Sequence, residues 1–320
     1  MKGKRSPVLW LLLGLLALGL FAWALRGVPL AEIGQALSQI SGEQILVLFL
    51  VNGAIVLLLG LRWWLILNAQ GHKLPFLGVT SYRLAAFGVS YFTPGPHFGG
   101  EPLQVIFLRQ RHSLDNSSAL ASVTLDKVMD LLSNFGFLSI GIAVVLRNGL
   151  LGSEFLFGVQ TVSAFLLVLP LLYLFALLRG WGFVTHLLAK AEQNWATLAK
   201  DGEEQLIVLL REKQNLVVQS LMVSALVWFA LLFEYWLGLR FLGLDLSLVQ
   251  LLAIVVAARL AMLAPTPGAL GALEAAQVVA MQSQGFDPAY GLSLSLLIRA
   301  RDLLFGGLGL WLGGRLLRGK

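Results

Sequence analysis

Long apolar runs, separated by short polar interruptions, dominate the chain. A run of about 20 apolar residues is long enough to cross a hydrocarbon core of about 30 Å as a helix. Such runs predict membrane-spanning helices at residues 8–25, 45–67, 118–146, 154–178, 216–239 and 288–312. The first run follows a basic start and so also fits a signal peptide, but its length and the spans that follow favour a first membrane helix.

Two further apolar tracts, residues 79–108 and 248–281, contain the proline- and glycine-rich stretches "YFTPGPHFGGEP" and "APTPGALGALEA". Proline and glycine end helices, and the freed backbone groups are tolerated at membrane depth only inside protein or beside a polar cavity. We therefore expect two re-entrant hairpins, although the longer first arm of the second tract leaves a full crossing open. The expected tip residues are Thr93, Pro94, Gly95, His97, Gly99, Gly100, Thr266, Pro267, Gly268 and Gly271.

The distribution of lysine and arginine sets the expected orientation, because cytoplasmic loops are enriched in both. The basic amino-terminal segment and the basic carboxyl-terminal segment place both termini in the cytoplasm. The first broken tract runs from near Lys73 to Arg109 and Arg111, so it enters and leaves on the cytoplasmic side. The second tract has flanks without lysine or arginine, which indicates a hairpin from the opposite face.

The two halves of the chain carry matching motifs. Thr93 precedes Thr266 by the same number of residues as Glu101 precedes Glu274, and "KVMDLL" precedes "RARDLL" by one residue fewer. Each half reads helix, broken hairpin, helix, in opposite directions through the membrane, as in inverted-repeat transporters. The prediction is one all-α polytopic membrane domain over residues 1–320: a first helix and outer loop (1–43), repeat 1 (44–178), a cytoplasmic amphipathic connection (179–215) and repeat 2 (216–320).

Composition narrows the function classes. Hydrophobic residues make up 58% of the chain and charged residues 12%, which excludes an ordinary soluble domain. The net charge of +6 is attributed to membrane orientation and not to nucleic-acid binding. The chain has no cysteine, and the four histidines lack metal-ligand spacing, so no metal site and no cofactor are expected.

Ionisable side chains inside the spans are the candidate site, because a charge at that depth costs about 2.5 to 3.5 kcal/mol and should face the interior and pair. The candidate substrate-binding residues are Arg83, Lys127, Arg259, Arg299 and Arg301. The candidate coupling or charge-pairing residues are Glu101, Asp126, Asp130, Glu274 and Asp302. Two alternatives stay open: the repeated charges could form internal salt bridges only, and the two glutamates could cap helices instead of titrating.

Four further residues or segments have simpler expected roles. Arg62 stands beside Trp63 and Trp64 and reads as an interfacial anchor, and Glu234 among aromatic residues reads as a belt residue. The glycine-rich residues 306–314 predict close helix packing. His97 is expected to form hydrogen bonds at the hairpin tip and not to relay protons.

The stretches "YFTPGPHFGGEPLQVIFLRQ", "ASVTLDKVMDLL", "PTPGALGALEAAQVVAM" and "LLIRARDLL" resemble the lysylphosphatidylglycerol synthase transmembrane family, also called flippase-like or UPF0104 proteins. The resemblance covers residues 45–312 and implies a role in moving lipids between leaflets. Lysylated phosphatidylglycerol is implied for fused synthases, and polyprenyl-linked or hopanoid lipids for stand-alone members. This chain lacks the soluble aminoacyl-transferase domain, so synthase activity is not expected. Lys127, with Asp126 before it, stands where the family more often has arginine.

The expected function is therefore a lipid flippase of the cell's inner (plasma) membrane that moves an anionic phospholipid or polyprenyl-phosphate-type lipid by alternating access. The chain lacks the sequence "GxxxxGK[ST]" of a phosphate-binding loop, so direct ATP hydrolysis is not expected. The partners expected are membrane lipids, with a homo-oligomer or an envelope-biosynthesis protein as further possibilities. The alternatives are a non-transporting scaffold for an envelope enzyme and an intramembrane lipid-modifying enzyme acting through His97 and Glu101.

Overall fold

The computed structural model describes residues 30–93, 99–148, 153–191 and 193–318, all of them helical or in short connections, with no strand among them. The predicted span at 8–25 and the tip residues Pro94, Gly95 and His97 lie outside these ranges. The helices are α2 (Leu30–Ser38), α3 (Gly42–Ala69), α4 (Phe76–Phe92), α5 (Glu101–His112), α6 (Asn116–Arg147), α7 (Ser153–Leu178), α8 (Phe183–Leu187), α9 (Asn194–Glu212), α10 (Asn215–Phe241), α11 (Leu248–Ala261), the short 3-10 helix η1 (Pro267–Ala269), α12 (Ala272–Gln282) and α13 (Pro288–Arg318).

Four of the described helical segments are long and apolar enough to cross a membrane: Gly42–Ala69, Asn116–Arg147, Gly158–Leu178 and Asn215–Phe241. Much of their apolar surface faces outward, since the side chains of Phe165 and Phe229, for example, are 63% and 70% exposed. A soluble protein does not leave so many large apolar side chains uncovered. The chain is an all-α polytopic membrane protein.

Local side chains define where these helices start. Ser41 and Ser247 each form a capping box with the glutamine three residues later, before α3 and α11 respectively. The carboxylate of Asp115 accepts the Ser118 amide at 2.9 Å ahead of α6. The predicted boundaries of the spans after residue 30 are close to those observed, and the exception is α13, which continues to Arg318.

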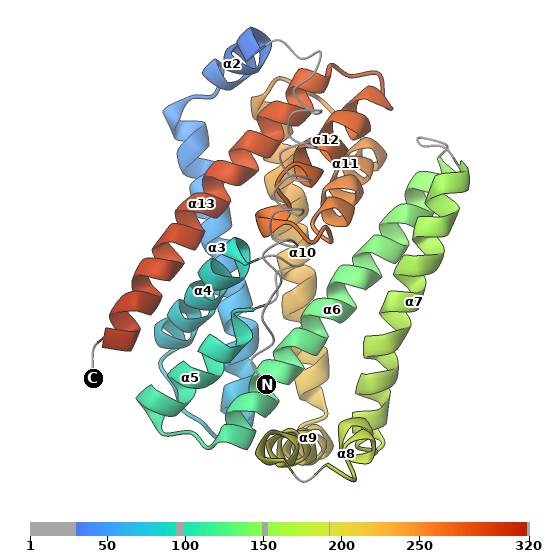
Figure 1. Ribbon diagram of the computed structural model, residues 1–320. Coiled ribbons are helices and arrows are strands. Elements are labelled where there is room, and N and C mark those ends of the chain that lie inside the picture. The colour runs from blue at the N-terminus through green and yellow to red at the C-terminus, as the bar shows by residue number, and fades with distance from the viewer. Residues whose placement is uncertain (1–29, 94–98, 149–152, 192, 319–320) are drawn as a thin grey trace, which may run out of the picture.

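The two broken tracts form helical hairpins, α4–α5 and α11–α12. Figure 1 shows them beside opposite ends of α13. Helix α11 has 14 residues and so rises about 21 Å, which is short of the hydrocarbon thickness of about 30 Å. This length favours a re-entrant arm over the full crossing that the sequence left open, and the re-entrant path stays a prediction.

Glycine allows α13 to approach α4 closely. A β-carbon on Gly309 would lie 2.1 Å from the carbonyl oxygen of Leu84, and one on Gly88 would lie 2.6 Å from that of Gly306. Gly313, one turn further along α13, faces the side chain of Ala85. The predicted close packing of the glycine-rich segment is confirmed for this face of α13.

The connection between the halves contains α8 and α9, which lie together at one end of the bundle (Figure 1). Helix α9 buries Leu206, Leu209 and Leu210 in a cluster with α6 and α7, whereas Trp195 is 59% exposed. This distribution is the amphipathic pattern predicted for the segment. The carboxylate of Glu203 accepts the amides of Val184 and Thr185, which joins α9 to α8.

Candidate functional site

A cavity of about 390 Å³ lies inside the bundle, between the two hairpins and the long helices. Residues of α3, α4, α5, α6, α10, α11 and α13 line it, so both halves of the chain contribute. Its basic lining side chains are Arg62, Arg83, Lys127, Arg259 and Arg301. Its acidic ones are Glu101, Asp126, Asp130 and Asp302. A cavity lined by charged side chains is typical of a transport site in proteins with discontinuous helices.

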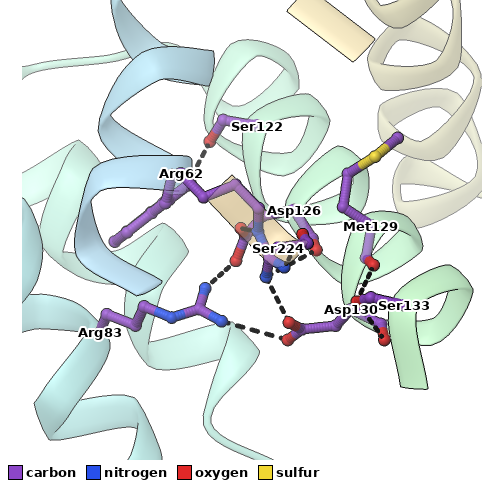
Figure 2. A network of polar contacts seen from close by, with 9 residues as sticks. Arg62, Arg83, Ser122, Asp126, Met129, Asp130, Ser133 and Ser224 are labelled. Carbon is purple, nitrogen blue, oxygen red and sulfur yellow. Dashed lines mark hydrogen bonds and ion pairs between the residues drawn. The ribbon is translucent and has the colours of Figure 1, made fainter. Parts of the chain in front are cut away.

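Two arginines and two aspartates form the Arg–Asp cluster on one wall, seen in Figure 2. Arg62 of α3 places Nε 2.8 Å from Asp126 Oδ1, pairs with Asp130 as well, and donates to Ser224 Oγ at 2.9 Å. Arg83 of α4 bridges the same carboxylates, contacting Asp126 and lying 3.1 Å from Asp130 Oδ2. The cluster is electrically balanced and ties α3, α4 and α6 together.

The interpretation of Arg62 as an interfacial anchor is wrong, because its side chain is only 1% exposed. The prediction was based on the two adjacent tryptophans, because tryptophan is enriched at membrane interfaces. Trp63 is fully buried and donates to Ser122 Oγ at 3.3 Å, and Trp64 donates to the Leu74 carbonyl at 2.8 Å. Two aspartates on one face of α6 need more positive charge than Lys127 supplies, and this imbalance was the signal available in the sequence.

Glu101 begins α5 and joins the first hairpin to α6. Its Oε1 lies 2.7 Å from Lys127 Nζ, and its Oε2 accepts the Gly99 amide at 2.8 Å. Gly99 has a φ of +128°, which favours glycine, and a β-carbon on Gly100 would lie 2.0 Å from the Ala86 carbonyl oxygen. The first hairpin therefore needs both glycines to bring Glu101 to Lys127.

The second hairpin repeats this arrangement. Arg299 Nε lies 2.8 Å from Glu274 Oε1, and Glu274 Oε2 accepts the Gly271 amide at 2.8 Å. Arg299 also donates to the carbonyl oxygens of Gly268 and Ala269. Both glutamates thus make the capping hydrogen bond that was one of their two expected roles. Their titration during transport stays a prediction.

Arg299 is absent from the cavity lining, unlike the other expected substrate-binding residues. Its Nη1 lies 3.4 Å from the Tyr91 hydroxyl, and Tyr91 ends the first arm of the other hairpin. Gly268 packs against the same ring, where a β-carbon would lie 2.8 Å away. Arg299 therefore joins the two hairpins and holds the second one to α13.

A second charge cluster surrounds Arg301. Its Nη1 lies 2.5 Å from Glu234 Oε1, and its Nε lies 2.8 Å from Asp302 Oδ1. Asn52 of α3 donates to Glu234 at 3.0 Å and accepts from Arg301 at 3.3 Å. The interpretation of Glu234 as a belt residue is wrong, since its side chain is 7% exposed and directed into the bundle, where it neutralises Arg301.

Comparison of the amino-acid sequence with known proteins identifies the family of this chain. Residues 10–309 match the family model described as "Lysylphosphatidylglycerol synthase TM region". The chain belongs to this family. It is also similar to a UPF0104 membrane protein of Methanothermobacter thermautotrophicus, with 22% identity over 92% of this chain and 91% of the relative. A UPF0104 membrane protein of Pyrococcus horikoshii is 22% identical over 76% of this chain and 78% of that protein.

Arg259 differs from the other basic residues of this family member's cavity. No ion pair to Arg259 occurs within the part of the chain that the structure describes, and its Nε is buried without a hydrogen-bond partner. Its guanidinium carbon lies 4.8 Å from the ring centroid of Trp228, which is a cation–π distance. A guanidinium that lines the cavity and has no ion-pair partner among the described residues is suited to bind an anionic group.

The sequence also selected residues that the structure keeps out of the cavity or leaves undescribed. Thr266 is fully buried and its hydroxyl donates to the Leu270 carbonyl, which makes it part of the second tip's own fold. Thr93 donates to the Ser90 carbonyl in the same way. His97 lies outside the described residues, and the described ones contain no group of three His, Asp or Glu side chains placed to hold a metal ion.

Proposed function

We propose that this protein moves an anionic lipid across the membrane, with the lipid's phosphate-type headgroup in the charged cavity. The observation that carries the proposal is the position of five basic side chains around one cavity: Arg62, Arg83 and Lys127 from the first half and Arg259 and Arg301 from the second. Charges so deep are costly and mark substrate or ion pathways in membrane proteins. The family resemblance, which implies lipid movement, points the same way.

The pairing pattern supports an anionic headgroup. Arg259 can donate to a phosphate without first breaking an ion pair, because no described acid lies within ion-pair distance of it and the nearby Glu234 and Asp302 pair with Arg301. Lys127 and Glu101 are each about a quarter exposed, so a headgroup can compete with Glu101 for the ammonium group. Arg62 and Arg83 remain engaged with Asp126 and Asp130 and shape the wall.

The two glutamate–cation pairs support alternating access. They occupy matching places in the two halves, yet only the pair of Lys127 and Glu101 lines the cavity. The pair of Arg299 and Glu274 is closed off, with side-chain exposures of 10% and 1%. In an inverted-repeat transporter the halves exchange conformations between states. The proposed alternative state opens the second pair and closes the first, and delivers the headgroup to the other leaflet.

We place this activity in the cell's inner (plasma) membrane, with anionic membrane lipids as the ligands. The lipid class is a phospholipid or a polyprenyl phosphate, since both present a phosphate to Arg259 and Lys127. A homo-oligomer or an envelope-biosynthesis enzyme is the proposed protein partner. The rival function, a scaffold that holds such an enzyme without moving lipid, predicts binding without transbilayer movement.

Transport in proteoliposomes tests the proposal. Vesicles of phosphatidylcholine with phosphatidylglycerol are reconstituted with wild type, Arg259→Gln, Lys127→Gln and the control Arg240→Gln, whose side chain is 55% exposed outside the cavity. Leaflet accessibility of phosphatidylglycerol is followed over time. A lost charge-assisted hydrogen bond is worth about 1.5 to 3 kcal/mol, or roughly 10- to 150-fold in affinity. We expect the cavity variants to lose most transport and the control to keep it.

Two results would contradict the proposal. Wild-type vesicles that move no phosphatidylglycerol and no polyprenyl phosphate, while the purified protein binds either one, would favour the scaffold. Folded Arg259→Gln and Lys127→Gln proteins with wild-type rates would remove the cavity from the pathway. Release of a headgroup from either lipid by the purified protein would instead indicate an enzyme.

A further inference from the structure

A second hollow, of about 510 Å³, lies against α6 in the space between α7 and α11. Its walls are aliphatic, with Leu138 of α6, Val159 and Val162 of α7 and Leu260 of α11 among them. We call it the α6–α7–α11 groove. Val162 is 59% exposed, so the groove is open along α7, on the side where the outward-facing apolar side chains mark contact with lipid.

The groove offers no free polar group to a headgroup among its described lining residues. Its one polar lining side chain is Ser163, which is 3% exposed and lies with its hydroxyl 3.2 Å from that of Ser139. Each hydroxyl therefore has a partner within the protein. An apolar groove with satisfied hydroxyls fits a hydrocarbon chain and excludes a charged or hydrogen-bonding ligand.

The groove adjoins the charged cavity. Phe135 of α6 and Leu263, just after α11, line both hollows. On the cavity side, Phe135 is one turn or more from Asp130 on the same helix, and Leu263 follows Arg259 by about one turn. A ligand with a charged end and an apolar end can therefore occupy both hollows at once, across the two shared side chains.

We infer that the α6–α7–α11 groove holds one hydrocarbon chain of the lipid whose anionic headgroup occupies the cavity. The inference rests on the proposed function and extends it, because it makes the substrate class a lipid that is recognised through its chain as well as its headgroup. A chain gains little by exchanging lipid for an aliphatic wall, so the groove positions the ligand and excludes ligands of the wrong shape.

The rival occupant is the apolar segment 8–25 of this chain, which lies outside the described residues. Eighteen residues of helix are about 27 Å long and about 10 Å wide, which is much larger than a hollow of 510 Å³. A single hydrocarbon chain is narrow enough to enter between α7 and α11. A wholly apolar helix would also gain nothing from the charged cavity beside the groove.

Photo-crosslinking tests which occupant is present. Phosphatidylglycerol with a diazirine in one acyl chain is reconstituted with wild type, Val162→Trp and Val168→Trp, and labelled peptides are mapped by mass spectrometry. Val168 is also on α7 and is 44% exposed, but it is not part of the groove, so it controls for the bulk of tryptophan. We expect the label to concentrate on residues 158–166 and 260–263, and Val162→Trp but not Val168→Trp to remove most of it.

Chain length separates this inference from the proposed function. Transport of dioleoyl-phosphatidylglycerol should fall severalfold in Val162→Trp, while binding of dihexanoyl-phosphatidylglycerol to the detergent-purified protein should be unchanged, because a short chain does not reach Val162. If the wild type transports the lipid but all outward-facing helices are labelled evenly, the inference about the groove is overturned and the proposed flippase function is not. Absence of wild-type transport would instead overturn the proposed function.

A disulfide assay tests directly whether residues 8–25 occupy the groove. The assay is possible because the chain has no native cysteine. Efficient cross-linking of Val162→Cys to a cysteine introduced within residues 8–25 would show that this segment fills the groove, and the inference would fail. Loss of thermal stability in Val162→Trp together with loss of dihexanoyl-phosphatidylglycerol binding would mean misfolding. The photo-crosslinking map of the wild-type protein then decides the question alone.

Discussion

Glu101 and Glu274 both stand in the first turn of the second helix of a hairpin, in two hairpins that are far apart in the sequence. Each accepts a glycine amide at 2.8 Å with one carboxylate oxygen and pairs with a cation of the following long helix with the other. One carboxylate thus fixes the start of a helix and its attachment to a neighbour. The surroundings differ, because the pair of Glu274 is closed off and that of Glu101 lines the cavity.

This difference predicts unequal costs of neutralisation. Glu274→Gln leaves Arg299 as a buried charge without its counterion, and breaking a buried pair typically costs about 3 to 5 kcal/mol. Glu101→Gln leaves Lys127 partly solvated, so its cost should be clearly smaller. The free energy of unfolding in detergent micelles, from denaturant titration, measures both. Equal losses would show that the two pairs are equally buried.

Arg62 gives a second prediction. Arg62→Leu leaves Asp126 and Asp130 with Arg83 as the one remaining cation of the Arg–Asp cluster, and we expect a loss of about 3 to 5 kcal/mol in unfolding free energy. Arg240→Gln removes an exposed pair and should cost less than about 1 kcal/mol.

Adding Asp130→Asn to Arg62→Leu should restore part of the stability, because it removes the uncompensated charge. An interfacial anchor would behave differently. Its loss would cost little in micelles, and Asp130→Asn would have no effect on it.

The sequence predicted the helices, the two hairpins and the repeated glutamates, because these depend on local signals such as apolar length, Thr-Pro-Gly breaks and matching motifs. It did not predict the partners of Arg62 or Glu234. Both residues stand beside aromatic residues in almost uniformly apolar helices, where no polar face shows which side is buried. Their partners come from α6 and α13, and such long-range pairs depend on the packing of the bundle.

The candidate cations show the same difference between features set by local sequence and features set by the packing of the bundle. Repeat matching made Lys127 and Arg299 equivalent residues, and each pairs with the glutamate of its hairpin, but equivalence in sequence does not require equal exposure. The tertiary contact of Tyr91 with Arg299 helps to enclose the pair of Arg299 and Glu274. No local sequence pattern around Tyr91 predicts this contact. Arg259 was selected for its depth alone, and its stacking on Trp228 depends on how α11 packs on α10.

Asp115, outside the membrane-spanning segments, gives a pH prediction. Partial burial alone would raise its pKa, but hydrogen bonds from Ser117, Ser118 and Gln205 outweigh this and hold the pKa of Asp115 well below its ordinary value. A carboxyl whose pKa is lower in the folded state stabilises the fold fully above its unfolded pKa of about 3.9. This stabilisation is lost as the pH falls through the folded value.

The matched variant is Asp115→Asn, which keeps a capping oxygen but does not titrate. The unfolding free energies of wild type and variant should differ most at neutral pH and converge as the solution is acidified below about pH 3.9. Titrations of other groups are common to both proteins and cancel in the comparison. A gap that stays constant or widens in acid would show that Asp115 does not have a lowered pKa.

The glycine face of α13 provides the sharpest test of the packing. A β-carbon at Gly309 would lie 2.1 Å from the Leu84 carbonyl oxygen, whereas one at Gly307 meets nothing within 4 Å. Both residues are inside the same helix, where replacing glycine by alanine otherwise stabilises by about 1 kcal/mol. Gly307→Ala should therefore raise the melting temperature slightly, and Gly309→Ala should lower it because α4 and α13 must separate. Because α4 carries Arg83, Gly309→Ala should also slow transport of phosphatidylglycerol, and equal behaviour of the two variants would mean that α4 does not contact α13 at this glycine.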